Sequence, residues 1–227
     1  MVEYNAPIRD YDFLFNEMFD AIPTVQKLGY DFDADFLSML TEGWAEHAKE
    51  VWLPINQLGD REGLKFDDGS IRMPEEFKSA YNESIEGGWL STACKPEHGG
   101  MGVPLFFQTV TWAEIGTSTN MAMSVLPALS LGVYDVLTEH GEKELIDYFA
   151  SKLASGKWAG TMCLTEPHAG TDLGIITTKA VPQGDGAYRV TGTKIFITYG
   201  EHDMTENIIH LVLAKTPGAP EGTKGIS

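Results

Sequence analysis

The sequence is poor in cysteine, in positive charge and in long apolar runs, and each shortage excludes a class of protein. Its two cysteines, Cys94 and Cys163, cannot build a disulfide framework, which favours a reducing, cytoplasmic location. Sixteen lysines and arginines stand against 33 aspartates and glutamates, giving a net charge of −17. A field of that sign repels nucleic-acid backbones and anionic membranes, so neither is expected as a partner.

No segment has the pattern of a targeting or membrane-spanning element. Residues 1–5 lack the basic and then apolar run of a signal peptide. No apolar run approaches the roughly 20 residues that a membrane-spanning helix needs. Internal repeats and low-complexity tracts are also missing. With 43% hydrophobic residues, the chain of 227 residues is still apolar enough for the core of one or two domains.

The spacing of apolar residues changes near residue 158, from helical before it to β-branched runs after it. We expect helices at 11–20, 35–52, 74–86, 104–118, 121–139 and 142–153, with a loop at 55–73. We expect strands at 158–164, 175–181, 188–198 and 207–214, with a hairpin turn at 184–186. These elements predict an α+β fold, with an all-α N-terminal domain (1–158) followed by an incomplete antiparallel β domain (159–227).

The first segment that could form a binding site, residues 161–172, runs from a predicted strand into a turn of small residues. Pro167 ends the strand and keeps the residue before it extended. Ala169 and Gly170 let a ligand approach the backbone. Free N–H groups beside the Thr171 hydroxyl can form a nest for phosphate oxygens. Taken alone, an ordinary capped loop explains these residues better.

The second segment, residues 192–200, carries an aromatic and a hydroxyl side chain two positions apart. In a strand, Phe196 and Thr198 would lie on one face. A ring beside a hydroxyl is a suitable wall for a flat cofactor. Taken alone, a half-buried strand is again the better explanation, so only the combination of the two segments is specific.

Together the segments resemble the acyl-CoA dehydrogenase family of flavoproteins. The resemblance rests on a Thr-Glu-Pro-x-Ala-Gly-Thr-Asp turn, a hairpin and a Gly-x-Lys-x-Phe-Ile-Thr segment, in that order. Residues 96–102 are similar to the family's Pro-Glu-x-x-Gly-Gly-x-Gly loop, and residues 141–157 match its next helix and turn less closely. Residues 4–17 look like the N-terminal extension of the 3-methylmercaptopropionyl-CoA dehydrogenase-like branch.

The resemblance implies an FAD-dependent enzyme that removes hydrogens from Cα and Cβ of an acyl-CoA thioester. The family's pattern places Leu164 and Thr165 at the flavin's pyrimidine edge, and Thr198 near N5. Thr171 would lie near the pyrophosphate and bind the CoA arm of the substrate. The full set of implied cofactor-binding residues is Met162, Cys163, Leu164, Thr165, Gly170, Thr171, Phe196, Ile197 and Thr198.

The resemblance identifies no catalytic base among the residues of this sequence. The family's catalytic glutamate lies in a C-terminal helical domain, and no residue here matches its motif; Glu166 belongs to the turn instead. We therefore expect a fragment that is inactive alone. The complete enzyme would transfer electrons to an electron-transfer flavoprotein and form a homo-oligomer.

Two other functions stay open at this point. An acyl-CoA oxidase-like flavoprotein would have the same fold, and a non-catalytic binding or assembly module would keep the fold without the chemistry. No metal site is expected, because Glu46, His47 and Glu50 are better explained as an ordinary solvated helix face.

Overall fold

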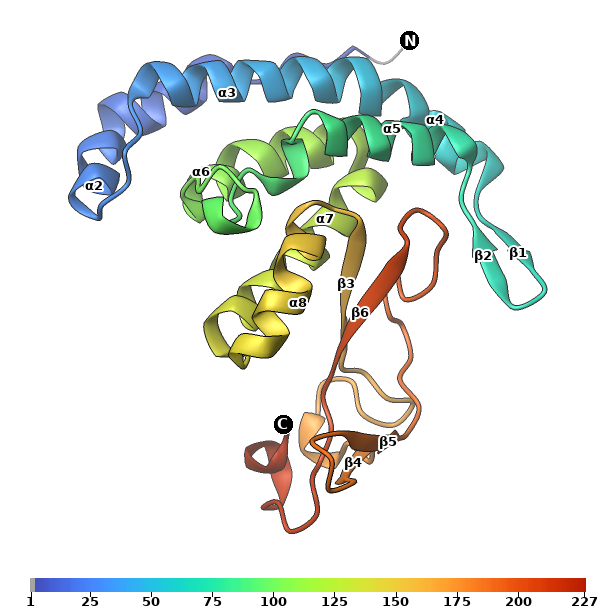
Figure 1. The fold of residues 1–227 in the computed structure, drawn as a ribbon. Coiled ribbons are helices and arrows are strands. Elements are labelled where there is room, and N and C mark those ends of the chain that lie inside the picture. Colours follow the sequence, from blue (N-terminus) through green and yellow to red (C-terminus); the bar gives the residue numbers. More distant parts are fainter. Residues whose placement is uncertain (1–2) are drawn as a thin grey trace.

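The computed structural model describes residues 3–227, with helices in the N-terminal part and short strands after them (Figure 1). Met1 and Val2, part of the opening considered for a signal peptide, lie outside the described residues. The α-helices are α1 (Ile8–Asp12), α2 (Ala21–Lys27), α3 (Ala34–His47), α4 (Leu53–Glu62), α5 (Glu75–Glu86), α6 (Leu105–Phe107), α7 (Glu114–His140) and α8 (Lys143–Ala154). The strands are β1 (Lys65–Asp67), β2 (Ser70–Arg72), β3 (Trp158–Cys163), β4 (Lys179–Pro182), β5 (Tyr188–Thr191) and β6 (Asn207–Val212). The predicted α+β class is confirmed.

The long helical run at the top of the molecule begins at a side-chain cap and passes through a π-helical turn (Figure 1). Asp33 accepts the Phe36 N–H at 2.8 Å, which satisfies one of the free donors at the start of α3. The π-helical turn Ala48–Trp52 then joins α3 to α4. Pro54 was expected to end the helix, but it lies in the first turn of α4, where a proline needs no N–H partner.

The predicted loop at 55–73 is therefore wrong, because α4 and an antiparallel hairpin occupy it. β1 and β2 pair from Lys65 with Arg72 to Asp67 with Ser70. Asp68 and Gly69 turn the hairpin with φ values of 44° and 83°, the left-handed pair that a two-residue hairpin turn requires. The sequence shows the turn residues, but each strand is only three residues long, too short to give an alternating pattern.

The predicted break between the helices at 104–118 and 121–139 corresponds to a kink in α7. Asn120 has φ −157° and ψ 95°, which is not helical. Its amide donates to the Trp52 carbonyl at 3.1 Å and accepts the Met123 N–H at 3.2 Å. The buried amide thus replaces the backbone bonds that the kink removes.

The helical run Leu105–His140 is long and apolar enough to cross a membrane on those two measures alone. No apolar run of that length was expected from the sequence. Core helices of soluble proteins pass the same test. Ile115, Met123 and Leu126 of this run are completely buried, so packing accounts for its most apolar side chains.

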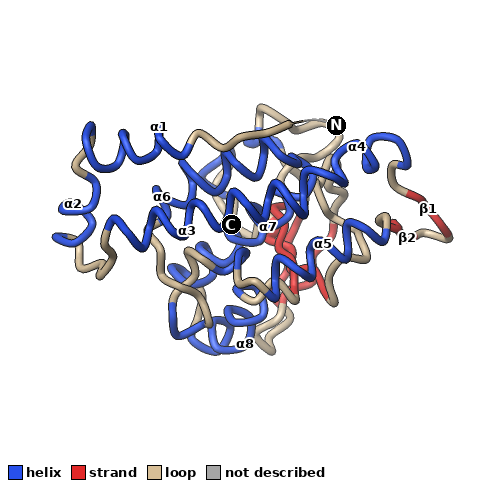
Figure 2. The backbone as a smooth tube through the Cα atoms, turned by 90° about the horizontal axis from the view of Figure 1, so that it is seen from above, coloured by secondary structure: helices blue, strands red, loops and turns tan. Residues whose placement is uncertain are grey.

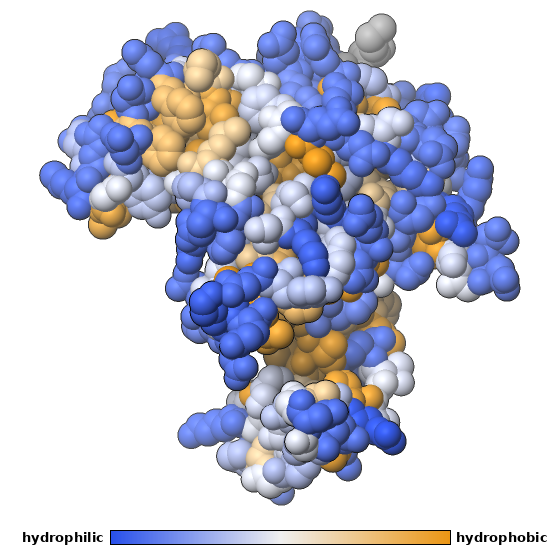
Figure 3. Space-filling view, viewed as in Figure 1, coloured by the Kyte–Doolittle hydropathy of each residue, from blue (hydrophilic) through white to orange (hydrophobic). Residues whose placement is uncertain are grey.

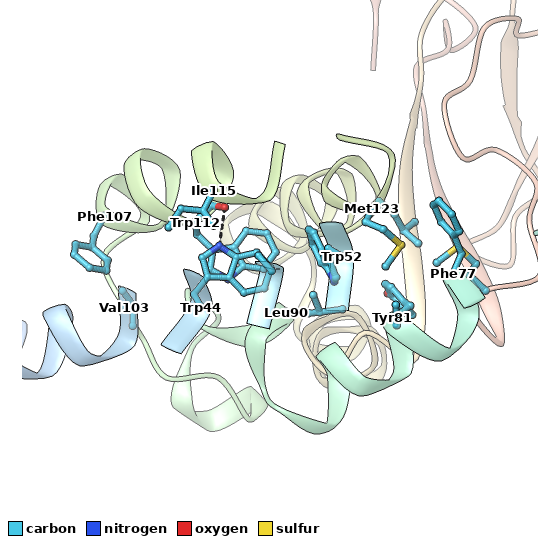
Figure 4. Close-up of a cluster of buried hydrophobic side chains, with 14 of the residues drawn as sticks. Trp44, Trp52, Phe77, Tyr81, Leu90, Val103, Phe107, Trp112, Ile115 and Met123 are labelled. Carbon is cyan, nitrogen blue, oxygen red and sulfur yellow. Dashed lines mark hydrogen bonds between the residues drawn. The ribbon is translucent and has the colours of Figure 1, made fainter. Parts of the chain in front are cut away.

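Three tryptophans form the centre of the helical core (Figure 4). Trp44 and Trp112 stack with ring centroids 4.1 Å apart and planes 7° apart. Trp52 meets Trp44 edge-on at 4.8 Å. The Trp44 indole N–H donates to the Trp112 carbonyl at 3.0 Å. Large rings with a satisfied polar atom therefore fix how α3 approaches the π-helical turn Gln108–Ala113, which leads into α7.

The four strands that follow the helices form two separate pairs, in addition to the β1–β2 hairpin (Figures 1 and 2). β4 and β5 are antiparallel around the predicted turn, whose Gly184 and Gly186 have φ values of 89° and 85°. β3 and β6 are parallel rather than antiparallel, and they pair from Trp158 with Asn207 to Cys163 with Val212. Residues 175–178 and 192–198, expected in strands, lie outside them.

Candidate functional site

The candidate site begins where β3 ends and the chain enters the turn at residues 164–171. Glu166 and Ala169 exchange both backbone hydrogen bonds, at 2.9 and 3.1 Å, so the turn is closed on itself. Gly170 and Thr171, which follow this closed part, are exposed. Within residues 3–227 their backbone N–H groups donate to no protein acceptor. The backbone N–H groups needed for the predicted phosphate-binding nest are therefore available at this turn.

The second segment, residues 194–198, lies directly against this turn. The Ile195 N–H donates to the Thr165 carbonyl at 2.9 Å. The Lys194 ammonium donates to the Leu164 carbonyl, also at 2.9 Å. Two segments about 30 positions apart in the sequence are thus neighbours at this point.

A buried ion pair fastens the two segments together. Glu166 is 2% exposed and accepts from the Lys194 ammonium at 3.0 Å. The same carboxylate also accepts the N–H groups of Thr177 at 2.7 Å and Thr178 at 2.9 Å. Sequence reasoning missed Lys194, whose only signal was its place in the Gly-x-Lys pattern.

These bonds also decide what Glu166 can do chemically. Burial alone would raise the pKa of its carboxyl, but hydrogen bonds from Thr178, Thr177 and Lys194 outweigh burial and hold that pKa far below the usual range. A carboxylate with every oxygen engaged and so low a pKa is a poor proton acceptor. The expectation that Glu166 is a structural member of the turn and no base agrees with this geometry.

The predicted strand over 188–198 is wrong in its second half, and the reason lies at Phe196. β5 ends at Thr191, and Phe196 takes a left-handed φ of 57° that no strand accepts. Its ring is 88% exposed, and Thr198 is exposed as well, whereas Ile197 is only half-buried. The ring and the hydroxyl are both accessible, although no strand face presents them.

The other implied cofactor-binding residues differ in what they expose. At the end of β3, Met162 is exposed and Cys163 is buried. Leu164 and Thr165 are half-buried. The Cys163 side chain therefore points away from the face that Met162 shares with solvent. Its backbone carbonyl is occupied by the Leu213 N–H at 3.1 Å.

The remaining candidates form no second catalytic centre within residues 3–227. His168 is exposed, as expected, and contacts the Ile175 carbonyl at 3.1 Å. Burial raises the pKa of the Cys94 thiol to about 12, which leaves it without nucleophilic character. No group of three or more histidine, cysteine, aspartate or glutamate side chains in this range is placed to hold a metal.

The architecture defines the class of the protein. A helical part followed by short strand pairs matches part of the fold of an acyl-CoA dehydrogenase structure. The crystal structure of the acyl-CoA dehydrogenase from Geobacillus kaustophilus superposes with a TM-score of 0.69 at 25% identity, covering 86% of this chain and 47% of that chain.

The sequence comparison gives the family. The model of the acyl-CoA dehydrogenase N-terminal domain matches residues 39–157, more than half of the chain. The chain belongs to the acyl-CoA dehydrogenase family of flavoprotein oxidoreductases. The 3-methylmercaptopropionyl-CoA dehydrogenase of Ruegeria pomeroyi is 41% identical over 226 residues, which is 99% of this chain and 38% of the relative. A butyryl-CoA dehydrogenase of Syntrophomonas wolfei is 39% identical over 184 residues, 79% of this chain and 30% of the relative.

Proposed function

We propose that this chain is the helical domain (1–158) and the first part of the flavin-binding β domain (159–227) of an FAD-dependent acyl-CoA dehydrogenase. The observation that carries the proposal is the Ile195–Thr165 hydrogen bond, which joins the two flavin-lining segments. The family membership supports the reaction class, an α,β-dehydrogenation of an acyl-CoA thioester. The chain spans only 38% of the length of the Ruegeria relative.

The residues at the site fit FAD. Gly170 and Thr171 offer unengaged N–H donors and a hydroxyl at an exposed turn, which suits pyrophosphate oxygens. Thr165 and Leu164 lie at the adjoining edge, where a pyrimidine ring needs hydrogen-bonding partners. Phe196 supplies an exposed ring for stacking. Met162 borders the same face from β3.

Bound FAD supplies the hydride acceptor, and this chain supplies its orientation. Thr165 and Thr198 would hold the edge of the flavin from two sides. Phe196 and Ile197 would shield the side of Thr198 from water. Thr171 would hold the pyrophosphate and the start of the CoA arm. Lys194 and Glu166 act through position alone, because their ion pair fixes the two segments.

We further propose that the chain has no turnover alone, since no residue of the sequence matches the motif of the family's catalytic glutamate and Glu166 is engaged by hydrogen bonds. In the complete enzyme the electrons would pass to an electron-transfer flavoprotein, and the enzyme would be a cytoplasmic homo-oligomer. The likeness to the Ruegeria enzyme favours a short thioether acyl group, as in 3-methylmercaptopropionyl-CoA.

The test compares FAD binding by threonine variants of the complete reading frame. Thr165→Val and Thr198→Val each remove one hydroxyl from the site, and Thr193→Val removes an exposed hydroxyl of the same segment as the control. Loss of one hydrogen bond predicts a roughly 3- to 10-fold rise in the Kd for FAD in the first two variants. Equal Kd values in all three variants would contradict the proposed site.

Turnover is tested separately, by acyl-CoA-dependent dye reduction. The complete protein should reduce the dye with FAD bound, and this chain alone should not. Turnover by residues 1–227 without added domains would refute the claim that the base lies elsewhere.

A further inference from the structure

The turn at residues 196–199 has an unusual backbone. Phe196 and Tyr199 have left-handed φ values of 57° and 54°. Such a φ brings the Cβ close to a carbonyl oxygen, so bulky residues adopt it only where other contacts hold them there. Within residues 3–227 the two other non-glycine residues with positive φ are aspartates, a type that tolerates this region. Two aromatic residues in this conformation, three positions apart, therefore need anchors outside the turn.

The first anchor lies just before the turn. The Ile195 N–H donates to the Thr165 carbonyl at 2.9 Å, and the Lys194 ammonium donates to the Leu164 carbonyl at the same distance. These two bonds fix the residues that lead into the turn. They leave the other end of the turn, at Tyr199, to be held separately.

The second anchor is the side chain of Tyr199. Its hydroxyl donates to the Ala122 carbonyl in α7 at 2.6 Å, across 77 positions of the sequence. The half-buried ring packs against the helical core. Burial raises the pKa of the hydroxyl to about 12, so it stays protonated and able to donate at neutral pH. One hydrogen bond thus joins this end of the turn to the helical part.

The carbonyl that Tyr199 reaches is itself held in place. Ala122 lies two positions after Asn120, the non-helical residue at the kink of α7. The Asn120 amide donates to the Trp52 carbonyl at 3.1 Å, and the Trp52 side chain is completely buried. The bond from Tyr199 therefore ends on backbone that the helical core has already fixed.

Packing alone does not set the position of Thr198, which lies between the two anchors. An open cavity of about 500 Å³ lies beside the turn, and Thr198, Tyr199 and Ala122 all line it. Thr198 is also exposed. Because the cavity leaves space on that side of the turn, the distance of the turn from α7 depends on the hydrogen bond of Tyr199.

We propose that Tyr199 is a positioning residue for the proposed flavin site. Its hydroxyl, bonded to the Ala122 carbonyl, holds the strained turn and so sets where the Thr198 hydroxyl stands. The inference rests on the proposed function, which gives Thr198 its role beside the flavin. Tyr199 acts through Thr198 and does not itself touch the cofactor.

The first experiment measures the Kd for FAD in variants of the complete protein. Tyr199→Phe removes the hydroxyl and keeps the ring, so it should raise the Kd roughly 2- to 5-fold, as the loss of one hydrogen bond predicts. Tyr188→Phe is the matched control, because Tyr188 lies in β5 and is 56% exposed. Its Kd should equal that of the parent protein.

Double variants show whether Tyr199 acts through Thr198. Tyr199→Phe combined with Thr198→Val should have the Kd of Thr198→Val alone, because the hydroxyl that Tyr199 positions is already gone. Tyr199→Phe combined with Thr165→Val should instead multiply the two single effects, since Thr165 is held by other bonds. Multiplied effects in both double variants would overturn the inference.

Two further readouts separate positioning from a general structural role. Without FAD, amide hydrogen exchange in peptides covering residues 196–200 should be faster in Tyr199→Phe than in Tyr188→Phe. With FAD, the visible absorption bands of the flavin should shift in the same direction in Tyr199→Phe as in Thr198→Val. A lower Tm in Tyr199→Phe with unchanged exchange and unchanged flavin bands would mean that the tyrosine only stabilises the fold.

The single variants distinguish the two ways in which the inference can fail. If Thr198→Val weakens FAD binding and Tyr199→Phe does not, the flavin site stands and the positioning role is refuted. If neither Thr165→Val nor Thr198→Val changes the Kd, the flavin site itself is wrong, and the role of Tyr199 falls with it.

Discussion

The helical and strand-bearing parts of the chain are held together by different forces. The helical part has fully buried aromatic side chains, with Trp44, Trp52 and Tyr81 at its centre. In the strand-bearing part, every residue of β5 is exposed and β4 has no buried residue. A two-stranded sheet without a buried face is marginal in water. Outside the buried strand β3, the strand part therefore depends on polar contacts such as the one between Glu166 and Lys194.

The difference between the two parts separates the residues that stabilise the fold from those of the proposed flavin site. The helices contain the buried aromatic core. The turn and loop segments that carry the proposed flavin contacts are joined to each other by hydrogen bonds. Exposed apolar surface is also visible between the upper and lower parts of the molecule (Figure 3). Met162 and Phe196 are among the exposed apolar residues of the chain. Stability and ligand contact thus come from different residues, and substitutions can separate them.

The largest effect is expected for Trp44→Ala. The side chain is 1% exposed and packs against three other tryptophans, so its removal leaves a cavity and should lower the free energy of unfolding by about 4 kcal/mol. Urea unfolding followed by circular dichroism measures the change. Tyr148→Ala, at an aromatic residue that is largely exposed, should cost much less. Equal losses would mean that the tryptophan cluster is not the stabilising core.

Lys194→Met tests the strand-bearing part. It leaves the Glu166 carboxylate buried without its cation, and removing one partner of a buried pair should cost about 3 kcal/mol. The double variant Glu166→Gln with Lys194→Met should recover part of that loss, because no unpaired charge remains. Proteolysis within residues 164–198 should increase in the single variant. Unchanged protection there would show that the ion pair does not join the two segments.

The sequence predicted those features that local chemistry determines. The helix start after Pro74, the break near Asn120 and the turn at Gly184 and Gly186 follow from single residues with strong backbone preferences. The family motifs also placed residues 164–166 beside residues 194 and 195, which hydrogen bonds between the two segments confirm. Such residues determine the backbone conformation within a few positions of themselves, so their effect can be read directly from the sequence.

The features that were missed depend on distant partners. Pro54 is compatible both with a helix end and with the first turn of a new helix, and the π-helical turn before it decides between them. β3 pairs in parallel with β6, across more than 40 intervening residues. The left-handed Phe196 is held by the bond between Ile195 and Thr165. None of these choices is encoded in the neighbouring residues alone.

A smaller effect of pH should come from His47 in the helical part. Burial lowers the pKa of this imidazole to about 4, and its Nε2 lies 2.8 Å from the Ser84 hydroxyl. Between pH 6.5 and 4 the unfolded chain binds a proton that the folded chain does not, so stability falls as the pH falls through this range. The loss should reach about 2 kcal/mol. His47→Gln should flatten that slope relative to the parent chain, and identical slopes would contradict the assignment.

The smallest effect, and one of opposite sign, is expected at Phe196. Its left-handed φ of 57° costs a residue with a Cβ about 1 kcal/mol, and its exposed ring recovers little of this cost by packing. Phe196→Gly should therefore leave stability unchanged or raise it by up to about 1 kcal/mol, while it weakens FAD binding by the complete protein. Phe66→Gly is the matched control, because Phe66 is also exposed but lies in strand β1, where glycine should cost about 0.5–1 kcal/mol. If Phe196→Gly destabilised the protein as much as Phe66→Gly, the ring would be a packing element, and the strain at this position would need an explanation other than ligand contact.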